Sequence, residues 1–243
     1  MKACPSTTFF QAIPAVIVLS VLSCEASTLW SVDLQGDGNG GAFGQTVPVL
    51  MAGSEASSGL GNVWNAFTVS GDNSTTTNPS LNLVDSDGSP SSVFFSITGT
   101  LSGWSQNGSA LLSDYIFVNA GNSDPFLDWA ITGLVPGQEY EMYAYGSISR
   151  SAGLLIDHDG DNSLADESLG IVTGSGLLFS GLTASAGGSI IGRMSPGATS
   201  QGDWSGFQLV AVPEPSSMTL LGLGSLALLL RHRRQSSQVE TSL

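Results

Sequence analysis

Hydrophobic and polar residues alternate along the chain in short runs that are separated by glycine, proline, asparagine and aspartate. In one run Val93, Phe95 and Ile97 fall on one face of an extended segment while Ser96 and Thr98 fall on the other, as in a half-buried strand. Eleven runs rich in β-branched and aromatic residues occur, at residues 29–34, 65–69, 80–84, 93–101, 115–118, 127–134, 140–145, 154–156, 177–182, 189–194 and 207–212. Their spacing predicts an all-β body built as a single β-sandwich.

One segment of the body predicts a specific corner of that sandwich. The run from Ile131 to Tyr143 has the pattern of a strand, a turn at Pro136 and Gly137, and a second strand, with Tyr140 placed to pack at the corner. It resembles segments of fibronectin-like or galactose-binding-like sandwiches, and this resemblance implies a jelly-roll-like subtype. The 31 glycines agree with a β fold, because glycine costs about 1 kcal/mol relative to alanine inside a helix.

The N-terminal 27 residues have the composition of a targeting signal, here called an address, rather than of a folded element. Lys2 is followed by an apolar stretch and then by small residues up to Ser27, the order of charge, apolar core and cleavage site found in secretory signal peptides. We therefore expect residues 1–27 to form a signal helix that is removed on export. As an alternative processing route, the residues before Cys24 loosely resemble the lipidation box of bacterial lipoproteins.

The C-terminal residues 212–243 form a second address with three parts. Val212, Pro213, Glu214 and Pro215 precede an apolar segment at residues 218–230, and a basic cluster of Arg231, Arg233 and Arg234 follows it. The 15 uncharged residues from 216 to 230 would span about 22 Å as a helix, which is short of the ~30 Å hydrocarbon core. Arginines at the far edge favour the cytoplasmic side, so the preceding body would lie outside.

This three-part tail resembles the PEP-CTERM sorting signal of Gram-negative bacteria, with Pro213, Glu214 and Pro215 matching its signature tripeptide. The resemblance implies recognition by an exosortase of the inner membrane, cleavage near the tripeptide, and transfer to the cell surface or extracellular matrix. It also implies that anchoring through the apolar helix is transient. The alternative is an ordinary single-pass anchor that follows a chance Pro-Glu-Pro linker.

The body between the addresses, residues 28–211, is strongly acidic. With the first residues of the tail, up to 215, it has 18 acidic residues against Arg150 and Arg193, a formal net charge of −16. Nucleic acid is excluded as a partner, because phosphate contacts need cations. Cys4 and Cys24 both precede the body, which therefore has no disulfide and no thiol nucleophile. The acidic surplus also has a simpler explanation, namely solubility of an exported domain.

The richest group of candidate ligands follows the run at 154–156. Carboxylates alternate there much as oxygen ligands do in calcium loops. This pattern makes calcium the candidate cofactor. The candidate ligands are Asp157, Asp159, Asp161, Asp166 and Glu167. Asn162 and Ser168 occupy positions where an EF-hand needs glycine and glutamate, so the alternative is a solvated hairpin whose side chains bond their own backbone.

The role of the body is predicted to be structural or adhesive rather than catalytic. Two alternatives stay open: a carbohydrate-binding module, with extracellular polysaccharide as partner, and a secreted glycoside hydrolase. Four tryptophans are candidates for stacking on sugars if they share an exposed face, namely Trp64, Trp104, Trp129 and Trp204. They are otherwise expected in the core. A hydrolase needs a pocket of converging acids with shifted titration.

Overall fold

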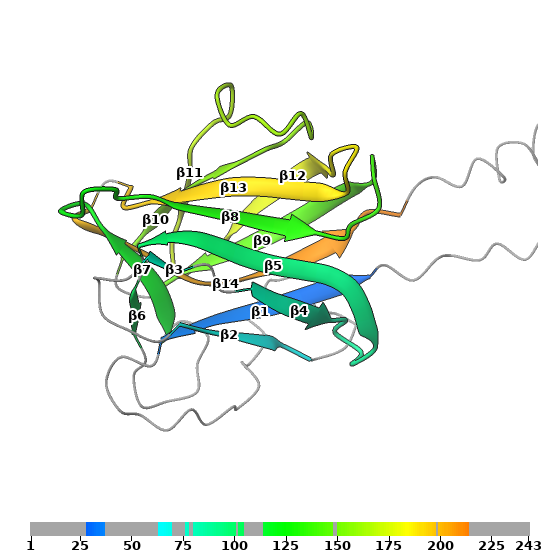
Figure 1. Cartoon of the computed structure of the whole chain (residues 1–243), viewed down its shortest axis with the longest axis horizontal. Helices are drawn as coiled ribbons and strands as arrows, with labels where there is room; N and C mark the ends of the chain where they lie inside the picture. The colour runs from blue at the N-terminus through cyan, green and yellow to red at the C-terminus, as the bar shows by residue number, and fades with distance from the viewer. Residues whose placement is uncertain are drawn as a thin grey trace, which may run out of the picture. The chain divides into compact units, whose positions relative to one another are not determined.

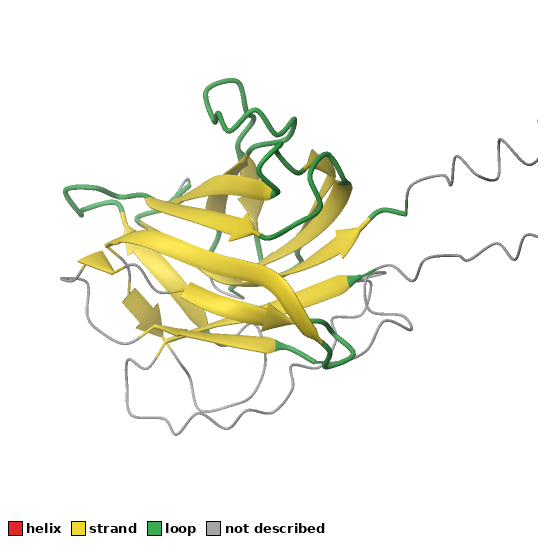
Figure 2. Ribbon diagram, turned by 45° about the vertical axis from the view of Figure 1, so that its right-hand side comes forward, coloured by secondary structure: helices red, strands yellow, loops and turns green. Residues whose placement is uncertain are grey.

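The computed structural model describes residues 28–36, 63–69, 76–77, 80–100, 102–104, 114–147, 150–197 and 199–213. These residues form β-strands and loops without a helix (Figure 2). The strands are β1 (Leu29–Gly36), β2 (Asn65–Val69), β3 (Thr76–Thr77), β4 (Ser80–Val84), β5 (Pro90–Thr100), β6 (Ser102–Trp104), β7 (Tyr115–Asn119), β8 (Leu127–Thr132), β9 (Glu139–Gly146), β10 (Ala152–Ile156), β11 (Gly170–Val172), β12 (Leu177–Thr183), β13 (Ser189–Ser195) and β14 (Gln201–Ala211). The predicted all-β class is confirmed.

The strands form two sheets (Figure 1). Sheet A has the order β12-β9-β14-β1-β2, with β7 pairing β14 and β6 pairing β7. Sheet B has the order β11-β10-β13-β8-β5-β3, with β4 also pairing β5. The described pairs are antiparallel except β1 with β2, which run parallel. The two predicted flanking helices and the predicted signal peptide lie outside the described residues.

The alternating pattern in the sequence determines which face of sheet B enters the core. Val93, Phe95 and Ile97 of β5 are buried, while Phe94 and Thr98 are exposed. The same alternation holds in β8 and β13, which pair in register with each other. Because side chains in a strand point to opposite faces in turn, these three strands present one apolar face inward and one mixed face outward.

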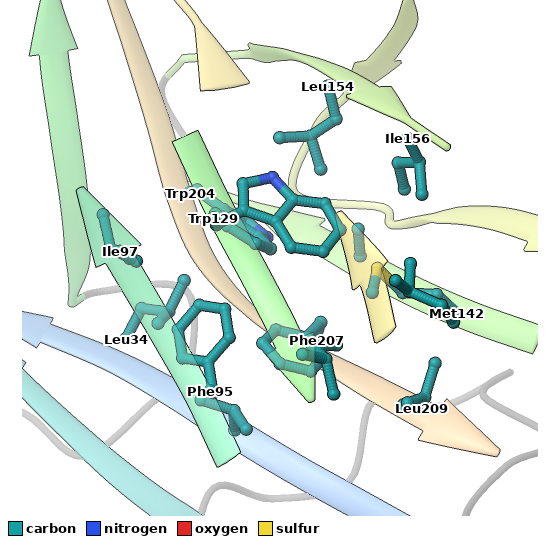
Figure 3. Packing of buried hydrophobic residues seen from close by; sticks show 14 of the residues in the cluster. Leu34, Phe95, Ile97, Trp129, Met142, Leu154, Ile156, Trp204, Phe207 and Leu209 are labelled. Atoms are coloured by element: carbon teal, nitrogen blue, oxygen red, sulfur yellow. The ribbon is translucent and has the colours of Figure 1, made fainter. Parts of the chain in front are cut away.

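The two sheets meet through an aromatic cluster (Figure 3). Trp204 of β14 lies against Trp129 of β8, with ring centroids 5.5 Å apart, and edge-on to Phe95 of β5 at 6.0 Å. Phe207 stacks on Trp204 at 5.6 Å and also contacts Phe95. These rings belong to strands of both sheets, so the sheets pack face to face as the predicted sandwich requires.

The predicted corner between β8 and β9 is present. The Gln138 amide donates to the Val135 carbonyl at 3.2 Å, and Gly137 has a φ of +74°. Pro136 before a glycine of positive φ is the signature of a type II turn. The hydroxyl of buried Tyr140 accepts a hydrogen bond from the Val135 amide at 3.1 Å, so the tyrosine fixes the point where the chain crosses between sheets.

Asp203 is a fully buried carboxylate on β14. Its two oxygens accept hydrogen bonds from the Ser147 hydroxyl at 2.9 Å and from the Gln201 amide at 2.8 Å. Burial raises the pKa of this carboxyl, and the two hydrogen bonds and the charge of Arg150 oppose that effect only in part. Burial and the charge of Asp203 raise the pKa of Tyr115, and the charge of Arg150 opposes them.

We expect Asp203→Asn to stabilise the body at neutral pH. The amide can accept from Gln201 and donate to the Ser147 hydroxyl, so both contacts survive without a buried charge. Since the native pKa lies above the unfolded one, ionisation of Asp203 favours unfolding as the pH rises through the native value. The melting temperature should rise by about 2 °C at pH 7, and the gain should vanish as the pH falls below 3.8, where the carboxyl becomes protonated in the unfolded as well as the native state. An unchanged gap across this range, followed by circular dichroism, would show that the charge has no role.

Candidate functional site

The C-terminal end of the sandwich runs directly into the predicted sorting motif. The last pairs of β14 join Ala211 to Tyr140, and the Val212 amide then donates to the Glu139 carbonyl at 2.9 Å. The Gln138 side-chain amide donates to the carbonyls of both Val212 and Glu139. Val212 is therefore still held by sheet A, and Pro213 is the first exposed residue beyond it.

The N-terminal end of the body lies at the same place. Leu29 of β1 pairs with Val210 of β14, and the Thr28 carbonyl accepts a hydrogen bond from the Ala211 amide at 3.0 Å. The first strand thus begins beside the end of the last one (Figure 1). The first residue after the predicted signal peptide and the last residue before the predicted motif are hydrogen-bonded neighbours.

Comparison with known families identifies the segment that begins at this junction. A sequence model of the PEP-CTERM protein-sorting motif matches residues 211–234. The chain carries a PEP-CTERM sorting motif. The match covers Val212, Pro213, Glu214, Pro215 and the basic cluster, as the resemblance in the sequence implied. The comparison with curated proteins gave no match.

The PEP-CTERM motif marks an exported protein that is anchored transiently in the membrane and processed by an exosortase. Of the predicted recognition residues the structure describes Val212 and Pro213. Glu214, Pro215, the apolar segment at 218–230 and the cluster of Arg231, Arg233 and Arg234 lie outside the described residues. Within the ranges that are described, no helix reaches the length and apolarity needed to cross a membrane.

The predicted calcium ligands are brought together in the loop between β10 and β11, residues 157–167, here called the acidic loop. Two triads have carboxylate oxygens within 4.8 Å of one another, and Asp159 belongs to both. One triad adds buried Asp157 and Glu167, and the other adds exposed Asp161 and Asp166. Such spacing is what oxygen ligands of calcium need.

The same carboxylates also cap the backbone of the acidic loop, as the alternative interpretation predicts. Asp157 accepts bonds from the amides of Gly160 and Asn162, and Glu167 accepts one from the His158 amide at 2.6 Å. Asp159 and Asp161 each bond the amide two residues ahead. These bonds account for the shape of the loop without an ion. Calcium binding stays a prediction.

The four candidate tryptophans do not share an exposed face. Trp129 and Trp204 are 2% and 0% exposed and face each other in the core, so neither ring can stack on a sugar. Their large apolar area is better buried between the sheets than left in water. Trp64 and Trp104 are half-buried. A sugar platform built on all four is therefore wrong, and the core assignment is correct for two.

A groove that sequence reasoning missed lies on the outward face of sheet B, with a volume of about 430 Å³. Its floor is the mixed face of three adjacent strands, and the acidic loop forms one wall. The side chains that line it include Ser96, Thr98, Asp128, Ile191, Arg193, Asn162 and Leu164. The register places Thr98, Asp128 and Arg193 in one row across β5, β8 and β13. The alternation of residues in the sequence could have predicted which side chains point outward. It could not have predicted which strands are neighbours in the sheet.

An ion pair dominates the chemistry of this sheet B groove. Arg193 Nε and Nη2 donate to Asp128 Oδ1 and Oδ2 at 2.6 and 3.2 Å, and the guanidinium lies 5.5 Å from the centre of the Phe126 ring. This pairing raises the pKa of Arg193 further above its ordinary value. The groove thus offers planar polar groups beside an aromatic ring, which suits ligands rich in hydroxyl groups.

A second hollow, of about 460 Å³, lies between the acidic loop and β12. His158, Asp166 and Glu167 line it together with Leu177, Leu178 and Phe179. His158 Nε2 lies 3.0 Å from the Ser180 carbonyl. The carboxyls whose pKa is raised by burial, Asp85 and Asp203, line neither of the two hollows.

Proposed function

We propose that this protein is a non-catalytic structural or adhesive component of the cell surface or extracellular matrix, delivered there by an exosortase. The observation that supports the proposal is the place where the folded body meets the sorting motif. The match to the PEP-CTERM motif begins at Ala211, the last residue of the last strand, and the body's first strand begins beside it. A domain attached this way needs no linker, and its sides are left for contacts with neighbouring material. A jelly-roll or galactose-binding-like subtype is part of the proposal.

A non-catalytic body is supported by where the titratable groups lie. Acid and base catalysis needs converging groups with shifted pKa values in a hollow. In the described part of the chain, the carboxyls of raised pKa are elsewhere, and Asp203 is sealed from solvent. His158, the one histidine of the body, is exposed and bonded to a backbone carbonyl. These observations favour a binding or structural role over glycoside hydrolysis.

The test is the intact mass and the location of the native protein in a host with an exosortase and in the same host without it. We expect the mature protein to lose the residues beyond the tripeptide and to reach the surface or medium only when the enzyme is present. An intact tail and membrane residence in both hosts would overturn the proposal and indicate a permanently anchored domain.

A second candidate function is binding of a neutral polysaccharide in the sheet B groove. Phe94 and Phe126, 46% and 40% exposed, flank the row of Asp128 and Arg193 on the outward face. Phe94 is in register with Thr132, six residues along β8 from Phe126, or about 20 Å at ~3.4 Å per residue. That length suits several sugar units, and the acidic body disfavours polyanions.

We expect Arg193→Met and Phe126→Ala each to weaken this binding about tenfold, because each removes a charged hydrogen-bond donor or a stacking face. Stability should change little, since an exposed ion pair contributes about 0–1 kcal/mol. Affinity electrophoresis of the processed protein in gels containing neutral glucans, galactomannan or acidic alginate measures the effect. Leu178→Ala, on β12 of sheet A, is the matched control. Polysaccharide binding in the groove would be rejected if the native protein migrated equally in all gels. It would also be rejected if Phe126→Ala were retarded as strongly as the native protein.

A further inference from the structure

The turn Val135–Gln138, here called the junction turn, is joined to the start of the PEP-CTERM motif. Its Gln138 side chain donates to the Val212 carbonyl, and the next residue, Glu139, accepts the Val212 amide. Pro213 directly follows Val212, so the tripeptide begins one residue after this contact. Any partner that grips the motif must therefore approach this turn closely.

The number of residues after Pro213 limits how far the apolar segment can lie from the end of the body. Five residue steps separate Pro213 from Met218, where the apolar segment begins. Even fully extended, these steps cover at most about 18 Å. Until the tail is cut, at most about 18 Å of chain therefore separates Pro213 from the start of the apolar segment.

The exposed surface of the junction turn is apolar. Val135 is 62% exposed, more than any other large hydrophobic residue of the described part, and Pro136 and Gly137 are exposed beside it. No lysine or arginine occurs in the turn, and Glu139 next to it is acidic. Anionic lipid headgroups attract basic segments, so this surface fits a protein partner better than a lipid surface.

The junction turn is also preformed. The Val135 amide is held by the Tyr140 hydroxyl, and the Gly137 amide donates to the Ala184 carbonyl at 2.9 Å. A rigid apolar projection loses little conformational entropy on binding. It can therefore serve as an anchor at an interface, whereas a mobile loop of the same composition would bind less well.

We infer that the exosortase reads the junction turn of the folded body together with the PEP-CTERM tripeptide, with Val135 as the anchoring side chain. The inference rests on the proposed sorting role. It predicts that processing depends on a surface 77 residues upstream of Val212, in a part of the chain that the tail motif does not include.

Replacement of Val135 by Asp in the full chain should slow conversion of precursor to mature protein by about fivefold or more, as expected when an interface loses an anchor. Ile171→Asp is the matched control. It changes an apolar residue of β11 that is 44% exposed. Ile171 pairs with Gly153, and Gly153 pairs with Ser195, which is at the end of β13 that lies away from the junction turn. Pulse-chase in the exosortase host measures both rates, and limited proteolysis of the mature protein checks that both variants fold.

Direct contact can be tested with a cysteine, because the body between the two addresses contains none. Val135→Cys and Ile171→Cys are each labelled with a thiol-directed photocrosslinker in cells that carry an exosortase with its nucleophile inactivated. We expect an exosortase adduct from Val135→Cys alone. Equal processing of the two aspartate variants, equal adducts, or crosslinking of Val135→Cys to lipid would overturn the inference while leaving the sorting role intact. Failure of the native chain to be processed would overturn both.

Discussion

A chain in which Pro213, Glu214 and Pro215 are all replaced by alanine is expected to keep its tail and to stay in the membrane fraction. The tripeptide lies within the matched motif, and the resemblance to PEP-CTERM signals implies that the exosortase recognises it. The apolar segment and the basic cluster remain, so targeting to the membrane should be unaffected. In an exosortase host we expect processing to fall from nearly complete to undetectable, as followed by intact mass and fractionation.

The control for this replacement is an equal change elsewhere in the tail. Gln235, Ser236 and Ser237 follow the basic cluster and lie outside the matched residues, so three alanines there should leave processing unchanged. The body should fold identically in all three proteins, because its last sheet contact is made by Val212. Cleavage of the alanine variant at the native rate would show that the tripeptide is not read.

Replacement of Trp204 by Ala is expected to cost about 3–5 kcal/mol of unfolding free energy, the range for removing a large aromatic side chain from a core. Trp204 is fully buried, contacts rings from both sheets, and donates from Nε1 to the Gly206 carbonyl at 3.0 Å. A loss of this size is a large part of the roughly 5–15 kcal/mol that holds a typical domain together. Urea unfolding of the mature protein, followed by circular dichroism, measures it.

Two variants calibrate this result. Trp204→Phe keeps part of the ring and should cost less than alanine. Trp64→Ala removes a half-buried indole from outside the core cluster and should cost less still. If Trp64→Ala proved as damaging as Trp204→Ala, the aromatic cluster of Figure 3 would not be the main contact between the sheets.

The alternation of residues was sufficient to find most of the strands. All eleven predicted runs coincide with strands, and the turn at Pro136 and Gly137 with its Tyr140 corner is where it was predicted. The short strands β3, β6 and β11 were missed, because two or three residues hold too little pattern. The first half of β14 was also missed. Its residues Gly202–Gly206 are buried irrespective of face, so glycine, aspartate and serine stand where alternation would predict apolar side chains.

The candidate sites divide in the same way. The sorting motif is a contiguous signal that a partner reads along the chain, so its residues could be identified from the sequence alone. The sheet B groove, and the contact of the junction turn with the motif, join segments that are distant in sequence, such as Asp128 with Arg193 and Gln138 with Val212. The tryptophans show the converse, since residue type alone could not distinguish a buried Trp129 from an exposed ring.

By itself, therefore, the sequence determined that this protein carries a sorting motif and that its body is made of strands, because targeting motifs and strand alternation are both local properties of the chain. The tertiary structure alone decided which strands are neighbours, since long-range pairing depends on how apolar faces from the whole chain bury one another. It placed Thr28 beside Ala211, so that both addresses leave from one end of the body. It also left Val135 exposed in a turn that is hydrogen-bonded to the start of the motif.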